Sequence, residues 1–231
     1  MRVAALVLGA GQGERLGHPL PKAFVPLAGR SLLAHAAEAL ARTPEVDWII
    51  PVLPEAALAE LDAALGAVAA DPKLAAAVAG GWERQDSVRA GLRALPPEVT
   101  LVAVHDAARA LVRPAAVSRV IQAAEVSGAA LLAVPAADTI KRVVGGRIVE
   151  SPPRSECWAA QTPQVFRREW LEQGLEKAAA EGFVATDCAQ LVEALGMEVT
   201  IVEGDPDNLK ITHPVDLILA EQILHEREQE A

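Results

Sequence analysis

Four glycines, one alanine and two cationic residues lie close together near the start of the chain. Segment 9–17 reads Gly-Ala-Gly-Gln-Gly-Glu-Arg-Leu-Gly and directly follows the apolar run Val3–Leu8. Because glycine permits positive φ and lets backbone N–H groups close around an anion, this loop predicts a phosphate cradle. It is neither a dinucleotide fingerprint, since Glu14 stands at the last glycine position, nor a Walker loop, since Pro21 precedes Lys22. Taken alone, the segment could also be a glycine-rich turn without a ligand.

Arg15 and Lys22 place two positive charges at this loop, and Pro19 and Pro21 stiffen the chain between them. Transfer of a nucleotidyl group gathers negative charge at the α-phosphorus, and preplaced cations stabilise that charge. The loop is therefore expected to serve phosphoryl-type chemistry. For any single lysine or arginine, a solvated surface position is the simpler alternative.

A second motif, His105-Asp106-Ala107-Ala108-Arg109, follows another apolar run. An aspartate in this place can bind Mg²⁺, which prefers one or two carboxylates together with phosphate oxygens and water. Asp106 is therefore the predicted metal ligand. His105 could act as a general base, although a packed histidine with one hydrogen bond is more common, and Arg109 could merely neutralise Asp106.

Two further segments are informative mainly in context. Segment 80–88 runs from a Gly-Gly turn into a helix start, where Ser87 or Asp86 is a plausible N-cap and contact with a ligand is the alternative. Segment 205–212 is a turn followed by a short apolar stretch, with Lys210 as its only cation.

The motifs described above follow short apolar runs. These runs alternate along the chain with longer alanine- and leucine-rich segments, as is typical of a mostly parallel sheet covered by helices. Strands are predicted at Val3–Leu8, Trp48–Leu53, Leu101–His105, Ala129–Val134 and Val199–Val202. Helices are predicted at Leu32–Arg42, Glu55–Leu65, Ser87–Ala94, Ala115–Ser127, Trp170–Ala180, Cys188–Leu195 and Val215–Glu228. Because ligands bind beyond the carboxyl ends of such strands, the site is expected in the loops after Leu8, His105 and Val134.

One segment breaks this alternation. Residues 139–150 are expected to form two short strands about Gly145-Gly146, which predicts a protruding β-hairpin. An isolated hairpin is marginal in water, so this arm, at about residues 136–158, is expected to pack on another subunit. A hairpin that lies on its own domain is the alternative.

Composition limits the remaining possibilities. The 231 residues, 52% of them hydrophobic, fit one domain, and a net charge of −10 is the wrong sign for binding extended nucleic acid. Cys157 and Cys188 are too few for a disulfide framework and lack zinc-site spacing, which favours a cytoplasmic protein. Every apolar run falls short of the ~20 residues that a membrane helix needs, so no membrane partner is expected.

Together, in their order and spacing, these motifs resemble those of the 2-C-methyl-D-erythritol 4-phosphate cytidylyltransferases, over nearly the whole chain. The matching positions are Ala10-Gly11-x-Gly13-x-Arg15, Pro21-Lys22, Gly80-Gly81-x-Glu83-Arg84-x-x-Ser87-Val88, His105-Asp106-Ala107-Ala108-Arg109, Asp138-Thr139-x-Lys141, Thr162-Pro163-Gln164, Thr186-Asp187 and Asp207-Asn208-x-Lys210. The resemblance implies a single Rossmann-like α/β domain over residues 1–231, similar to nucleotide-diphospho-sugar transferases, with the hairpin as a dimerisation arm.

The reaction implied by the resemblance joins CTP and 2-C-methyl-D-erythritol 4-phosphate into 4-diphosphocytidyl-2-C-methyl-D-erythritol and pyrophosphate, in non-mevalonate isoprenoid precursor synthesis. The alternative is a CTP-dependent enzyme for ribitol 5-phosphate or another polyol phosphate. A non-catalytic nucleotide-binding module is disfavoured because all the expected cations are present, and an NAD-linked oxidoreductase because the dinucleotide fingerprint fails.

The resemblance also implies roles for individual residues. Arg15 and Lys22 would stabilise the transition state at the α-phosphate of CTP, and Asp106 would hold Mg²⁺ or another divalent cation. The positions implied to bind the nucleotide are Leu8, Gly9, Ala10, Gly11, Gly13, Gly81 and Ser87. Those implied to bind the acceptor are Asp106, Arg109, Thr139, Arg154, Thr186 and Lys210, with Arg154 and Lys210 also catalytic and with Thr139 and Arg154 supplied by the partner in a homodimer.

Four residues, in three places along the chain, depart from the family pattern. Leu8-Gly9 stands where Pro-Ala is commoner, Trp82 replaces an acidic residue, and Ala110 replaces a proline after Arg109. The first two adjoin the predicted cytosine pocket, where backbone contacts can survive a changed side chain. Fewer matching side chains therefore support the prediction of cytosine selectivity than support the prediction of phosphate binding.

Overall fold

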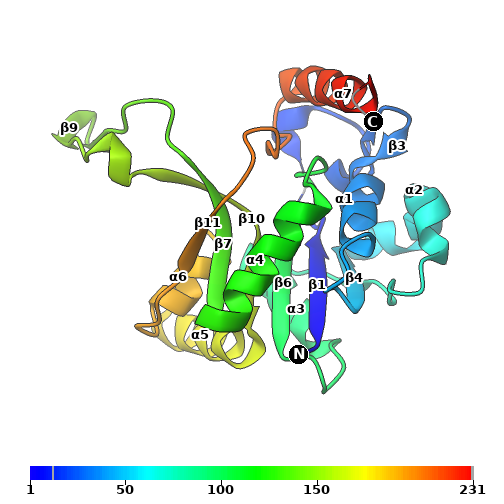
Figure 1. The fold of residues 1–231 in the computed structure, drawn as a ribbon, viewed down its shortest axis with the longest axis horizontal. Helices are drawn as coiled ribbons and strands as arrows, with labels where there is room; N and C mark the ends of the chain where they lie inside the picture. Colours follow the sequence, from blue (N-terminus) through cyan, green and yellow to red (C-terminus); the bar gives the residue numbers. More distant parts are fainter. Residues whose placement is uncertain (12, 230–231) are drawn as a thin grey trace.

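The computed structural model describes residues 1–11 and 13–229, and only the backbone of Glu14. Its centre is a seven-stranded sheet in the order β11-β7-β10-β6-β1-β4-β5 (Figure 1). The strands are β1 (Val3–Leu8), β4 (Trp48–Leu53), β5 (Val78–Ala79), β6 (Leu101–Asp106), β7 (Ala129–Pro135), β10 (Trp158–Arg167) and β11 (Thr200–Glu203). Neighbouring strands are parallel except for β10, which runs antiparallel to both β6 and β7.

Helices cover both faces of this sheet. The α-helices are α1 (Leu32–Ala41), α2 (Leu61–Leu65), α3 (Arg84–Arg93), α4 (Pro114–Ser127), α5 (Arg168–Glu181), α6 (Cys188–Glu193) and α7 (Pro214–Gln229). The 3₁₀ helices are η1 (Glu14–Leu16), η2 (Lys22–Phe24), η3 (Glu55–Glu60), η4 (Gly66–Ala70) and η5 (Arg154–Glu156). A two-stranded ribbon, β2 (Pro26–Leu27) with β3 (Arg30–Ser31), precedes α1.

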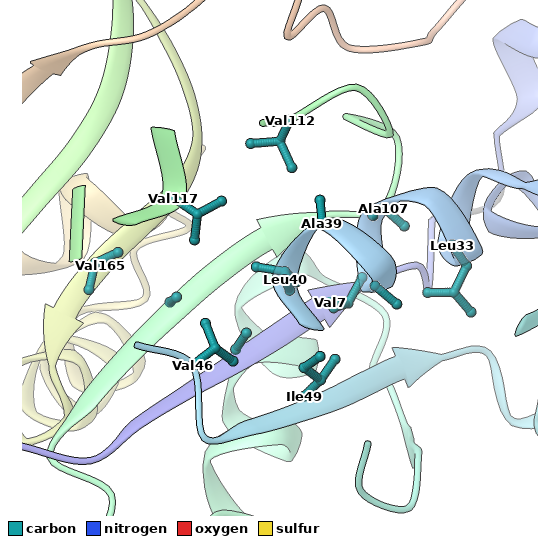
Figure 2. Packing of buried hydrophobic residues seen from close by; sticks show 14 of the residues in the cluster. Val7, Leu33, Ala39, Leu40, Val46, Ile49, Ala107, Val112, Val117 and Val165 are labelled. Carbon is teal, nitrogen blue, oxygen red and sulfur yellow. The ribbon is translucent and has the colours of Figure 1, made fainter. Parts of the chain in front are cut away.

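Alternation along β1 shows how the two faces are filled, because successive strand side chains point to opposite sides. Val7 and its odd-numbered neighbours belong to a buried cluster with α1 and α4, which Figure 2 shows around Leu33, Leu40 and Val117. Leu6 faces the other cluster, which contains side chains of α3, α5 and α6. Each such buried Leu or Val contributes roughly 1.5–3 kcal/mol, so the sheet is a firm base for the loops at its edge.

A third buried cluster lies beyond the carboxyl end of β1. Ala220 and Ile223 of α7 join Leu27 of β2 and Ile211 in this cluster. In Figure 1, α7 lies next to β3 at the end of the sheet toward which β1 points. This packing anchors the loop between β11 and α7 over that end.

The five predicted strands are confirmed to within one residue at each end, but β10 was not predicted. Its sequence contains Pro163 and three polar residues, and proline argues against a central strand because it cannot donate to the ladder. The structure accommodates it with a register shift between Ala160 and Gln164. Gln161, Thr162 and Gln164 are buried and bond to other parts of the chain, whereas Arg167 at the end of the strand is exposed.

Two helix predictions need correction. Glu55–Leu65 is not one α-helix but the 3₁₀ helix η3 followed by the short α2. Helix α3 begins at Arg84 and not at Ser87, and the carboxylate of Asp86 accepts a hydrogen bond from Glu83 N at 3.2 Å. Neither Ser87 nor Asp86 is therefore the N-cap residue, and the hydroxyl of Ser87 instead accepts from Gly81 N and donates to Glu83 O.

The predicted hairpin is present as β8 (Arg142–Val144) and β9 (Arg147–Glu150), joined at Gly145-Gly146. It stands away from the sheet in Figure 1. Four apolar side chains on it, Val143, Val144, Ile148 and Val149, are 49–62% exposed. In the described part of the chain, no helix has the length and apolar character needed to cross a membrane.

Candidate active site

A cavity of about 680 Å³ opens at the carboxyl ends of β1 and β6. Its volume lies in the range of small-ligand sites. It is lined by Leu8, Gly9, Ala10, Gly11, Gly13, Arg15, Lys22, Ala23, Gly81, Trp82, Glu83, Arg84, Ser87, Asp106, Ala107, Ala108, Lys210 and Thr212. The loops predicted after β1 and β6 are thus brought together, whereas the loop after Val134 leads into the arm and does not line this cavity.

The glycine-rich loop packs closely against Lys22 and β4. Gly9 N donates to Val52 O at 2.8 Å, which ties the start of the loop to the sheet. Gly13 has a φ of +70°, and a Cβ there would come within 2.6 Å of the Lys22 Cβ. An L side chain at this position would displace Lys22, so glycine is required for both conformation and space.

Asp106 lies at the end of β6 between two cations. Lys210 Nζ is 2.7 Å from Asp106 Oδ2, and Arg84 Nη2 is 3.4 Å from Oδ1. Burial alone would raise the pKa of Asp106, but the charges of Arg84 and Lys210 hold it well below its usual value. The carboxylate is therefore ionised at neutral pH. Arg84 also donates to Cys188 Sγ at 2.9 Å, so its guanidinium is held from two sides.

Lys22 titrates well below an ordinary lysine. Burial, together with the nearby charge of Lys210, lowers its pKa to about 8. Asp106 and Asp216 act in the opposite direction, and Arg15 adds to the lowering. Lys22 is thus a partly buried cation with other cations near it, and a polyanionic ligand would neutralise this positive charge.

A buried chain of hydrogen bonds supports Asp106 from behind. Asp106 N donates to Thr162 Oγ1 at 3.0 Å, and this hydroxyl lies 3.0 Å from His105 Nδ1. His105 Nε2 is 3.2 Å from Arg109 O, so the tautomer inferred from these contacts carries its proton on Nε2. Because burial lowers the pKa of His105 to about 4, the ring is neutral and fully enclosed, which disfavours the general-base alternative.

Gly81, Trp82 and Ser87 form another wall of the cavity. Gly81 N donates to Ser87 Oγ at 3.2 Å, which fixes the turn onto the first helical residues of α3. Trp82, one of the departures from the family pattern, is 89% exposed at the rim. The backbone of Gly81 thus lines the cavity beside the changed side chain, and its contact with a base stays a prediction.

Four residues predicted to bind the acceptor do not line this cavity. Arg109 donates to Asn208 O and Ala160 O, and Thr186 is exposed beside α6, where its N–H donates to Gln190 Oε1. Thr139 and Arg154 are exposed on the arm, where the Arg154 guanidinium reaches Ala137 O.

Arg84 and Thr212 line the cavity although no role was predicted for them. Arg84 stood within one of the matched motifs, but only the fold reveals that the first residue of α3 faces the end of β6. Thr212 lies two residues after Lys210, and its hydroxyl donates to Lys210 O at 2.9 Å. Spacing alone gives no signal for either contact.

The carboxylate of Asp106 fits a magnesium ion held largely by its substrate. Among the described residues, no three acidic, histidine or cysteine side chains gather to form a complete metal cage. Mg²⁺ commonly needs only one or two carboxylates when phosphate oxygens and water fill the other positions. A single ionised aspartate beside a phosphate cradle matches that requirement.

Comparison with known proteins decides between the families that share such a site. Residues 3–226 match the family model described as 2-C-methyl-D-erythritol 4-phosphate cytidylyltransferase. The chain belongs to this family.

Individual cytidylyltransferases of the family agree with the match along their whole length. The enzyme named 2-C-methyl-D-erythritol 4-phosphate cytidylyltransferase from Geotalea uraniireducens is 43% identical over 226 residues, 97% of each chain. The crystal structure of that cytidylyltransferase from Thermus thermophilus has 37% identity and a TM-score of 0.76, with 97% of this chain and 100% of the other covered. The structure of 4-diphosphocytidyl-2C-methyl-D-erythritol synthase from Anaerococcus prevotii has 28% identity and a TM-score of 0.87, over 97% and 98% of the two chains.

Membership confirms the predicted family, fold class and enzyme class. The chain is a nucleotidyltransferase of the cytidylyltransferase type, and the predicted reaction is the one for which the family is named. The ribitol phosphate alternative receives no support from these relatives.

Proposed function

We propose that this site transfers the cytidylyl group of CTP to 2-C-methyl-D-erythritol 4-phosphate, giving 4-diphosphocytidyl-2-C-methyl-D-erythritol and pyrophosphate for non-mevalonate isoprenoid precursor synthesis. One observation carries the proposal. Three cations from separate loops, Arg15, Lys22 and Lys210, line one cavity with Asp106 beside the glycine-rich loop. A triphosphate and an acceptor phosphate need this concentration of positive charge.

The nucleotide would occupy the part of the cavity between the glycine-rich loop and α3. Backbone N–H groups of the loop at Gly11 and Gly13, which line the cavity, would bind the phosphates, because amides that converge on one point favour anions. Gly81 and Ser87 would face the base, where hydrogen bonds from fixed backbone groups can read the edge of cytosine. This placement leaves the Lys210 side of the cavity for the acceptor.

In the transfer step, an oxygen of the acceptor phosphate attacks the α-phosphorus of CTP in line with the bond to the β-phosphate. The new P–O bond forms as the old one breaks, and its electron pair leaves with pyrophosphate. No proton need be removed from the attacking oxygen, because a phosphate monoester is largely dianionic near neutral pH. Positioning and charge stabilisation by Arg15 and Lys22 would then supply most of the rate.

Asp106 would hold Mg²⁺ together with phosphate oxygens of CTP. When bound, the ion would supply positive charge at the triphosphate as pyrophosphate departs. Arg84 and Lys210, which hold Asp106 in the structure, would keep its carboxylate ionised and oriented. The remaining donors of the Lys210 ammonium would bind the acceptor phosphate.

The arm would complete the site of a second subunit in a homodimer. The exposed apolar side chains of β8 and β9 support this, because an isolated hairpin with such a surface is marginal in water. Thr139 and Arg154 on the arm would then reach the partner's acceptor site, with Arg109 and Thr186 near it. All 231 residues would form one domain with this extension, and a cytoplasmic location stays a prediction from the cysteine content.

A mixing experiment tests the shared site. Lys22→Ala and Arg154→Ala are each expected to lower activity at least about 100-fold, since each removes a cation from the transition state. After subunit exchange at equal concentrations, about a quarter of the sites are expected to combine an intact Lys22 with an intact Arg154 from the partner, and activity should return accordingly. If Arg154 acts within its own chain, the mixture stays as inactive as its components.

The lowered pKa of Lys22 predicts a pH dependence. Below about pH 8 the free enzyme carries the lysine charge, so kcat/KM for CTP is expected to be level there and to fall as the pH rises above it. Bound triphosphate favours the charged form, so kcat should stay level to higher pH. Lys22→Arg keeps its charge throughout and should remove the fall in kcat/KM. An unchanged fall in that variant would assign the titration to another group.

The acceptor is tested by incubating the protein with CTP and Mg²⁺ and measuring pyrophosphate release. Methylerythritol phosphate is expected to support turnover, with 4-diphosphocytidyl-2-C-methyl-D-erythritol as the second product. Ribitol 5-phosphate serves as the comparison acceptor, and ATP, GTP and UTP as comparison nucleotides. Release with ribitol phosphate but not with methylerythritol phosphate would overturn the proposed substrate.

A further inference from the structure

The loop between β11 and α7 presents Lys210 to the cavity. Its ammonium lies 2.7 Å from Asp106, although nearly half of its side chain is exposed. A lysine side chain is a flexible four-carbon stem, so its charge is placed reproducibly only when the backbone that carries it is fixed. The contacts that fix this loop are therefore relevant to catalysis.

Asn208, two residues before Lys210, is the most deeply buried polar side chain of the loop, with 1% exposure. Its Nδ2 donates to Gln161 Oε1 at 3.2 Å and to Thr162 O at 3.0 Å, both on β10. The reverse amide orientation would place Oδ1 against these two oxygens, so the donor assignment is well determined. The backbone carbonyl of Asn208 also accepts from Arg109 Nη1 at 2.6 Å.

The same loop is held on both sides of Lys210. Gln161 Nε2 donates to Asp205 O at 2.9 Å, and Asn208 N donates to the same carbonyl at 2.9 Å. After Lys210, Ile211 N donates to Ala108 O at 2.9 Å. The backbone of Lys210 is thus held between β10 on one side and the loop after β6 on the other.

On the basis of the role proposed for Lys210, we propose that Asn208 is a positioning residue for cytidylyl transfer. Its carboxamide fixes the loop to β10 so that Lys210 reaches the acceptor phosphate. Asn208 does not itself line the cavity, and Lys210, two residues away on the same loop, is the lining residue through which it acts. The role is chemically specific, because a side chain of similar shape without two donors cannot pair with these buried oxygens, and an unpaired buried acceptor is costly.

A residue that merely stabilised the fold would weaken the enzyme regardless of Lys210. A positioning residue that works through Lys210 has nothing left to position once Lys210 is removed. The two roles therefore predict different results in a double-mutant cycle, in which kcat and KM are measured for Asn208→Leu, Lys210→Ala and the pair.

With Lys210 present, Asn208→Leu is expected to lower kcat/KM for the acceptor by about 10-fold or more, while the Kd for CTP changes less than about threefold. In the Lys210→Ala background, adding Asn208→Leu is expected to lower the single-turnover rate by less than about threefold. Losses that multiply in the double variant, or a normal kcat/KM in Asn208→Leu, would overturn the proposal.

A matched control is available on the same strand. Gln164 is also a buried amide of β10, but it bonds to Asp187 and to the backbone of Cys188 at α6, away from the Lys210 loop. Gln164→Met should therefore lower kcat/KM for the acceptor by the same factor whether Lys210 is present or replaced by alanine. Gln161→Met removes the acceptor for one of the two Asn208 hydrogen bonds, so its effect on kcat/KM should depend on Lys210 in the same way as that of Asn208→Leu. It replaces Asn208→Leu in the double-mutant cycle if that variant does not fold.

The wild-type assay separates this test from the reaction itself. If the wild-type protein released no pyrophosphate with any polyol phosphate, the proposed function would fail. If it turns over and the Asn208 and Lys210 losses multiply, only the positioning role fails.

Discussion

Lys22→Ala is expected to lower kcat by about 10²–10³-fold while CTP still binds. The reason is the position of Lys22 beside the glycine-rich loop, where its stem is packed against Gly13 and its ammonium faces the cavity with Lys210 and Arg15. Charge develops at the α-phosphate only as the transfer proceeds, so a cation fixed there stabilises the transition state more than the ground state. Steady-state kinetics and calorimetric titration with CTP measure the two effects separately.

Two variants serve as controls for this result. Lys177→Ala removes a lysine of α5 that bonds to Ala194 O, outside the cavity, and should leave kcat unchanged. Lys22→Arg restores the charge but not the shape of the ammonium, so partial recovery is expected. A near-normal kcat in Lys22→Ala would remove its assigned role, whereas loss of CTP binding without loss of kcat would assign it to the ground state.

Much of the sheet could be predicted because its strands are apolar on both faces. Strands such as β1 and β4 are covered by helices on either side. Because both faces are buried, nearly every residue of these strands is apolar, and they are visible in the sequence as short runs rich in Val, Ile and Leu. Strand β10 gives a weaker signal, because Gln161, Thr162 and Gln164 occupy three of its buried positions. Their hydrogen bonds go to groups far along the chain, so local pattern cannot reveal that the strand is central.

The candidate site could be predicted where its chemistry is local. The glycine-rich loop, Lys22 and Asp106 each follow a strand end or a stiff turn, and the structure places all of them on one cavity. Arg84 could not be assigned in this way, since it lies on α3 and its partner Asp106 is 22 residues away at the end of β6. Arg109 is the reverse case, in which the residue type predicts more than the structure shows. An arginine is well suited to bind a phosphate, but in this structure the guanidinium of Arg109 bonds to backbone carbonyls.

Asp106→Asn is the second substitution from which a large effect is expected. It keeps the shape of the side chain and the backbone bond to Thr162 but removes the negative charge between Arg84 and Lys210. Loss of the carboxylate should lower kcat by about 10²–10³-fold and raise the Mg²⁺ concentration needed for half-maximal rate. Asp47→Asn, which changes an aspartate paired with Arg2 away from the cavity, is the matched control.

The same substitution has an effect on stability that separates two explanations of lost activity. It leaves two cations close together without a counterion, so the free energy of unfolding is expected to fall by up to about 3 kcal/mol, less than for a fully enclosed pair because Lys210 is half exposed. Because the folded-state pKa of Asp106 is lowered, this stabilisation is present above its unfolded pKa and disappears as the pH falls toward the folded value. Urea titrations of both proteins should therefore converge at acidic pH. If stability falls as expected but the Mg²⁺ requirement is unchanged, Asp106 acts through its cations and not as the metal ligand.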